Sequence, residues 1–271
     1  MERPSDLACE TLEERKARLR SVNGGKEGRF LSSIPSYPRL CASDRDFRTA
    51  VELRLGLHLW GGQLDASGDS CDGSGNNHPH RWIAAVSAPG NGRIKRHDSM
   101  VNLLAHHMNA ARMEPTVEVT CRNTRGHHRA NGEDERTVRA DIRAWVDDEE
   151  QLYDVAIVHP VAPTYVRQAA KAPRSASRSI EQSKLRHYKS VVARRRCRCR
   201  CVPLVFETYG KWGAQAVKVV EKIVERRAGS KGSAHDRLWA RISSEISMCL
   251  QRGNARTVAD RTPWRGRPCP S

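Results

Sequence analysis

The fold of this protein is decided by the stretch VRADIRAWVDDEEQLYDVAIVHPV, residues 138–161. Two runs rich in β-branched and aromatic residues, VRADIRAW and LYDVAIVHPV, flank the acidic segment DDEEQ, and this pattern predicts a β-hairpin with DDEEQ as its turn. The second run is nearly continuous in apolar residues, which is typical of a buried strand. We therefore expect the principal sheet of the protein here.

The rest of the chain alternates between helical patterns and polar loops. The stretch 60–94 is rich in Gly, Ser, Asp, Asn and Pro, which predicts a loop or a disordered segment. Ser99 or Asp98 is expected to cap the helix that follows it. The run PLVFETYG at 203–210 predicts another strand, so the expected fold class is α/β, a small mixed sheet flanked by helices, with disordered basic segments. Apolar spacing predicts helices at about 10–22, 46–55, 99–113, 179–192, 214–227 and 235–252.

The composition points to a polyanionic partner. Lys and Arg total 47 against 31 Asp and Glu, a formal net charge of +16. Such a surplus favours nucleic acid, because binding releases the counterions condensed on the phosphates. A membrane surface would need an amphipathic basic helix with a broad apolar face, which the sequence lacks. A solvated basic surface without a partner stays open, and nothing predicts a small-molecule substrate.

The sequence also bears on the compartment. The first twenty residues, MERPSDLACETLEERKARLR, contain no apolar core of signal-peptide length. No run approaches the roughly 18 apolar residues that span a bilayer. Nine irregularly spaced cysteines do not suggest a disulfide framework. We expect an intracellular protein, nuclear or cytoplasmic, that is not secreted.

Acidic residues on the predicted hairpin are the first candidate site. Asp141 and Asp154 fall on neighbouring strands, where two carboxylates can share a divalent ion, and oxygen ligands are what Mg²⁺ prefers. Glu114, at the end of the preceding helix, could complete the ligand set. The alternative is that these acids simply lie on a solvated face.

Several blocks of the sequence resemble, in the same order, the C-terminal end of non-LTR (LINE-type) retrotransposon reverse transcriptase polyproteins. In that family a restriction-endonuclease-like region follows the polymerase. The resemblance extends from Asp46 to Val258, and its departures from the family pattern indicate a degenerate copy. The blocks include FRTAVELRLGL, RHDSMVNLL, RADI, LYDVAIV, KLRHY, VPLVFETYG and ISSEISMCLQRGNA.

The resemblance implies a role for particular residues. The family's R-P-D block, with its metal-binding Asp, is matched by Arg139-Ala140-Asp141, in which the proline is lost. Asp154-Val155-Ala156-Ile157 matches the family's D-V-T-V strand, and Lys184 followed by Tyr188 matches a Lys and Tyr of the next helix. The implied activity is that of a DNA endonuclease. Asp141, Asp154 and Glu114 would hold Mg²⁺ or Mn²⁺, Lys184 would contact the phosphate and Tyr188 would assist.

Other positions argue against a zinc site. Leu59-Trp60-Gly61-Gly62 replaces the first cysteine pair of the family's zinc knuckle, so that Cys71 is left with His78, His80 or His97. A structural zinc ion commonly takes four ligands that arrive in closely spaced pairs. The run RRCRCRC at 195–201 is typical of low complexity, although its arginines could grip phosphates. Glu207, at the end of a predicted strand, could support the site from a third strand but is expected to face solvent, and the adjacent His106 and His107 are not expected to share a metal.

We predict five segments: an N-terminal arm (1–45, partly disordered), a helical segment with an eroded zinc-knuckle-like loop (46–112), a nuclease-like core (113–210), C-terminal helices (211–258) and a flexible tail (259–271). No reverse-transcriptase Tyr- or Phe-x-Asp-Asp motif occurs, so no polymerase activity is expected. Three hypotheses stay open: a metal-dependent nuclease, a non-catalytic basic nucleic-acid-binding remnant, and a pseudogene product.

Overall fold

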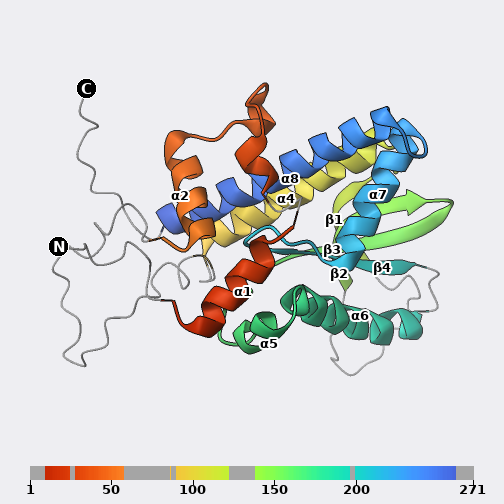
Figure 1. Cartoon of the computed structure of the whole chain (residues 1–271). Coiled ribbons are helices and arrows are strands. Elements are labelled where there is room, and N and C mark those ends of the chain that lie inside the picture. Colours follow the sequence, from red (N-terminus) through yellow and green to blue (C-terminus); the bar gives the residue numbers. More distant parts are fainter. Residues whose placement is uncertain are drawn as a thin grey trace, which may run out of the picture.

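The computed structural model describes residues 10–24, 28–57, 86, 90–121, 138–195 and 199–260. Within them a mixed β-sheet lies between two sets of helices (Figure 1). The elements are α1 (Leu12–Val22), α2 (Asp44–Leu55), α4 (Asn91–Ala110), β1 (Thr116–Cys121), β2 (Val138–Val146), β3 (Glu149–Val158), α5 (Val166–Lys171), α6 (Ser175–Arg195), β4 (Arg200–Glu207), α7 (Ala214–Ala228) and α8 (Ser233–Ala259), with 3₁₀ turns at Arg29–Ser32 and Pro38–Leu40.

The sheet follows the order β1-β2-β3-β4. The first three strands are antiparallel, and β4 runs parallel to β3 after a crossover through α5 and α6. The predicted α/β fold, a small mixed sheet flanked by helices, is confirmed, as is the hairpin within 138–161. The predicted turn DDEEQ was too long. Only Asp147 and Asp148 form it, with φ angles of 50° and 63°, because a two-residue turn with both φ positive matches the twist of the strands.

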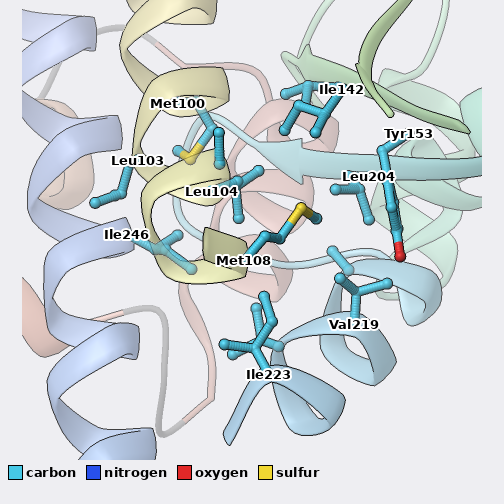
Figure 2. Packing of buried hydrophobic residues seen from close by; sticks show 14 of the residues in the cluster. Met100, Leu103, Leu104, Met108, Ile142, Tyr153, Leu204, Val219, Ile223 and Ile246 are labelled. Atoms are coloured by element: carbon cyan, nitrogen blue, oxygen red, sulfur yellow. The ribbon is translucent and has the colours of Figure 1, made fainter. Parts of the chain in front are cut away.

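The main hydrophobic core covers one face of the sheet. Because strand side chains alternate between faces, Ile142, Tyr153 and Leu204 point to the same side, where α4, α7 and α8 pack. This core joins residues from the predicted helical, nuclease-like and C-terminal segments. Figure 2 shows residues of this core, among them Met100, Leu104 and Met108 from α4, Ile223 from α7 and Ile246 from α8.

The opposite face of the sheet packs on α6. Val158 of β3 and Val205 of β4 contact Ala176, with Ile180 beside them. Asp154 is four residues before Val158 on the same strand and therefore points to this side. The helix that carries Lys184 and Tyr188 thus lies against the face that carries Asp154.

Helix α4 begins earlier than predicted. It starts at Asn91, so neither Ser99 nor Asp98 caps it, and the Ser99 hydroxyl instead donates to the Lys95 carbonyl inside the helix. Contacts with α8 explain the extension. A Cβ at Gly92 would lie 2.8 Å from the Cα of Thr257, so the glycine permits a close approach of the two helices. Packing against α8 therefore stabilises this first part of α4, although its sequence is polar and contains no N-terminal capping signal.

Two elements of the structure, β1 and α5, were not predicted from the sequence, and α8 continues past the predicted end at 252. The predicted loop at 60–94 lies mostly outside the described residues, but its last four residues belong to α4. The predicted tail lies outside them from residue 261 onward. None of the described helices has both the length and the apolar character needed to cross a membrane.

Candidate functional site

The site lies where β2 and β3 separate. Their ladder ends at the pair Ile142 and Tyr153, after which β2 continues along β1 and β3 continues along β4. One residue beyond that pair, Asp141 and Asp154 occupy facing positions on the two strands. The N–H of Val155 donates to the Asp141 carboxylate at 2.6 Å. The two predicted acids therefore meet at the strand fork.

Asp154 accepts two hydrogen bonds from α6. The Lys184 ammonium donates to Oδ1 at 2.6 Å, and the Tyr188 hydroxyl donates to Oδ2 at 2.7 Å. The two donors are four residues apart, and so they share one side of the helix. Burial, followed by the charge of Asp154 and the hydrogen bond to it, raises the pKa of Tyr188 well above its ordinary value. The phenol therefore stays protonated and acts as a donor.

Asp141 pairs with an imidazole that the sequence analysis named only as a possible zinc ligand. His97 Nε2 lies 3.3 Å from Asp141 Oδ2, and its Nδ1 lies 3.1 Å from Asp98 Oδ1. The hydrogen bond with Asp141 raises the pKa of His97 to about 9 against the opposing effect of burial. Burial would raise the pKa of Asp141, but His97 and the Val155 N–H lower it. The pair is ionic at neutral pH.

A cavity of about 780 Å³ opens at this fork. Both acids line it, together with the N-terminal half of α4, the end of β3 and α6. Charges of both signs line it, namely Asp141 and Asp154 together with Arg93, Arg96, His97 and Lys184. Such a cavity suits a group that carries negative charge and binds cations.

The structure does not bring Glu114 to the other predicted site residues. It is exposed in the connection between α4 and β1 and does not line the cavity. Since Val117 pairs with Ile142 and Val119 with Ala140, the residue level with Asp141 on β1 is Glu118, which is exposed. Glu118 was not among the predicted site residues because no strand was predicted there, although the alternation in TVEVTC indicates one.

The two aspartates fit a magnesium-type ion. Mg²⁺ usually binds through one or two protein carboxylates and completes its shell with water and substrate phosphates. Each carboxylate can accept about four hydrogen bonds or ligands, so the contacts from Lys184 and Tyr188 leave capacity on Asp154. Across the described residues, no three or more His, Cys, Asp or Glu side chains are grouped as a metal site. Cys71, His78, His80 and Cys197 lie outside those residues.

Two other acids have structural roles. Glu207 was predicted to face solvent, which is wrong. It is buried and accepts hydrogen bonds from the Ser21 and Ser177 hydroxyls at 2.7 and 3.0 Å, because α1 and α6 cover the end of β4. Glu245 of α8 is buried and lies 3.2 Å from His107 of α4, at the contact between these two helices.

The sequence was compared with known proteins. A scan against protein-family models finds no match, and a search of curated proteins finds none. The resemblance to the retrotransposon nuclease-like region therefore depends on the blocks quoted above and stays a prediction.

Proposed function

We propose that this protein is a divalent-metal-dependent nuclease that cuts DNA strands, of the restriction-endonuclease-like kind found at the end of non-LTR retrotransposon polyproteins. One observation carries the proposal. Asp141, Asp154 and Lys184, singled out from the sequence, line the same cavity, with Lys184 Nζ 2.6 Å from Asp154 Oδ1. The mixed sheet flanked by helices supports it. With DNA as its substrate, we propose a nuclear or cytoplasmic location.

Each residue has a stated role in this proposal. Asp141 and Asp154 would hold Mg²⁺ or Mn²⁺, which when bound polarises a phosphodiester and lowers the pKa of an attacking water. Lys184 neutralises the charge that develops on the phosphate oxygens, because a fixed cation in a partly desolvated cavity stabilises such charge strongly. Tyr188 keeps its proton and orients Asp154. Glu114 has no role in this proposal.

A second candidate is a basic protein that binds nucleic acid without cutting it. Both oxygens of Asp154 are already hydrogen-bonded, one to Lys184 and one to Tyr188, and the formal net charge is +16. This alternative predicts an affinity that falls steeply with salt and does not depend on divalent ions or on Asp154. A pseudogene product without function would instead unfold with poor cooperativity.

The test is nicking of supercoiled plasmid DNA by the full chain, with Mg²⁺ or Mn²⁺ and with EDTA. Asp154→Asn keeps the shape of the side chain and removes its charge. Asp147→Asn is the matched control, since Asp147 lies in the hairpin turn, 67% exposed, in a left-handed conformation that Asn tolerates. We expect nicking that needs the metal, survives in Asp147→Asn and disappears in Asp154→Asn. Binding without nicking would favour the second candidate.

A further inference from the structure

Arg96 is a buried cation that has no counter-charge among the residues that the structure describes. Its residue is 3% exposed, it lines the cavity at the strand fork, and its Nη1 donates to the Asn254 side-chain oxygen at 2.7 Å. Its Nε has no hydrogen-bond partner, and no described carboxylate forms an ion pair with it. Burying a guanidinium in this way is costly unless a partner compensates the charge.

The surroundings of Arg96 hold it in place. Gly253 of α8 lies against its aliphatic stem so closely that a Cβ at that glycine would overlap the stem. Burial, followed by repulsion from Arg93, lowers the pKa of Arg96 to about 10, so the side chain remains charged at neutral pH. The fold therefore keeps a positive charge at one fixed point of the cavity wall.

Two further features point to an anion at this wall. Arg93, one turn earlier on α4, also lines the cavity and is exposed. Gly90, the N-cap of the 20-residue helix α4, lines it too and has no side chain to cap the first N–H groups. The N-terminus of a helix attracts anions through these N–H groups and its dipole. A guanidinium fork matches phosphate oxygens better than a point charge does.

We propose that Arg96, Arg93 and the first turn of α4 bind a phosphate group of the nucleic-acid strand, next to the phosphate that is cut at Asp154. The anion site itself follows from a buried guanidinium that has no ion pair within the described residues. Its assignment to a second phosphate of the substrate strand rests on the proposed nuclease function. Free inorganic phosphate shares this chemistry, so the experiment separates the two sources.

The first arm measures thermal unfolding of the full chain in EDTA with increasing inorganic phosphate, at constant ionic strength set with chloride. A ligand that binds only the folded state raises the melting temperature. We expect this rise in the wild type and in Arg237→Met, a control at an exposed residue of α8 away from the cavity. Arg96→Met should lose the rise, while its melting temperature without phosphate is unchanged or higher, because an unpaired buried charge has been removed.

The second arm measures binding of a short single-stranded DNA in EDTA as a function of salt. Loss of one phosphate contact should make the slope of log affinity against log salt less steep by about 0.7. Affinity at low salt should fall about tenfold, the value of one hydrogen bond to a charged group. Arg93→Gln, at an exposed position, provides the same comparison should Arg96→Met not fold.

The outcomes separate the hypotheses. Unchanged phosphate stabilisation and unchanged salt slope in both arginine variants would overturn the site. If stabilisation by phosphate depended on Arg96 but DNA binding did not, the assignment of this site to the substrate strand would be overturned. Neither arm contains a divalent ion, so a failure of the nuclease hypothesis appears only in the plasmid assay with Asp154→Asn and leaves this result intact.

Discussion

Two carboxylates in this protein have nearly the same partners in different surroundings. Asp154 accepts hydrogen bonds from Tyr188 and Lys184 at 2.7 and 2.6 Å, and its side chain is 17% exposed at the edge of a cavity. Glu245 accepts hydrogen bonds from a tyrosine and an arginine at 2.6 and 3.1 Å, but its side chain is 0% exposed between α4 and α8.

The main difference between the two carboxylates is their access to solvent. The partners of Glu245, namely Tyr37, Arg241 and His107, come from three elements that enclose it, so they join segments that are far apart in sequence. Asp154 takes both partners from α6 and keeps one side open to the cavity. We therefore expect changes at Asp154 to alter activity and changes at Glu245 to alter stability.

The largest effect is expected from Lys184→Met. Removal of one donor that stabilises developing charge typically lowers the rate of the chemical step by roughly 10²–10³-fold. The free energy of unfolding should change by less than about 1 kcal/mol, because Asp154 is left next to solvent in the cavity. Plasmid nicking rates and urea unfolding measure the two quantities. Arg241→Met is the matched control at Glu245 and should leave nicking unchanged; equal nicking losses in both variants would contradict the comparison.

Glu245→Gln should have the opposite profile. The substitution removes the charge that accepts hydrogen bonds from Tyr37 and Arg241, and a hydrogen bond to a charged group is typically worth about 1.5–3 kcal/mol. Nicking by the folded protein should be retained. Urea unfolding at neutral pH measures the loss, and a variant as stable as the wild type would show that the α4–α8 contact does not depend on this charge.

The same carboxylate predicts a pH dependence. Burial would raise the pKa of Glu245, but the contacts with His107, Tyr37 and Arg241 outweigh it and hold the pKa at about 2, below the ordinary 4.5. A lowered pKa in the folded state adds stability that is complete above pH 4.5 and is lost as the pH falls toward 2. Between neutral pH and pH 3 the loss is about 2 kcal/mol.

The measurement is the difference in unfolding free energy between wild type and Glu245→Gln at several pH values. Taking the difference cancels the contributions that the other acids titrating in the same pH range make to the unfolding free energy. We expect the two proteins to converge as the pH approaches 2. A constant difference across this range would mean that the pKa of Glu245 is not lowered.

The hairpin and its acids were predictable because they are local. Alternation within 138–161 identifies the strands and assigns Asp141 and Asp154 to them, but their facing positions depend on the two-residue turn, which was predicted as five residues. Lys184 and Tyr188 were found only through the resemblance, since a helix lysine usually lies in solvent. Their contact with Asp154 depends on how α6 packs on the sheet.

The basic wall of the cavity was not predictable in this way. Arg96 precedes the first clear apolar repeat of α4, and its burial depends on Gly253, far away in sequence. Glu207 looked like an exposed strand end because the serines that bind it come from α1 and α6. Charged residues whose environment is built by distant segments give no periodic signal, so sequence alone assigns them to the surface.

The smallest effect compares the two tyrosines. Tyr188→Phe removes a donor from Asp154, which the cavity leaves accessible to water, so the expected loss of stability is about 1 kcal/mol. Tyr37→Phe removes a donor from Glu245, which water does not reach, and the expected loss is about 2 kcal/mol because a buried charged acceptor is left short of a partner. Urea unfolding of both variants under one condition measures the difference. Nicking should fall only in Tyr188→Phe, by a few-fold, since Asp154 loses an orienting contact. If Tyr188→Phe proved the more destabilising of the two, Asp154 would be a structural carboxylate like Glu245. The proposed distinction between an accessible functional carboxylate and a buried structural one would then be wrong.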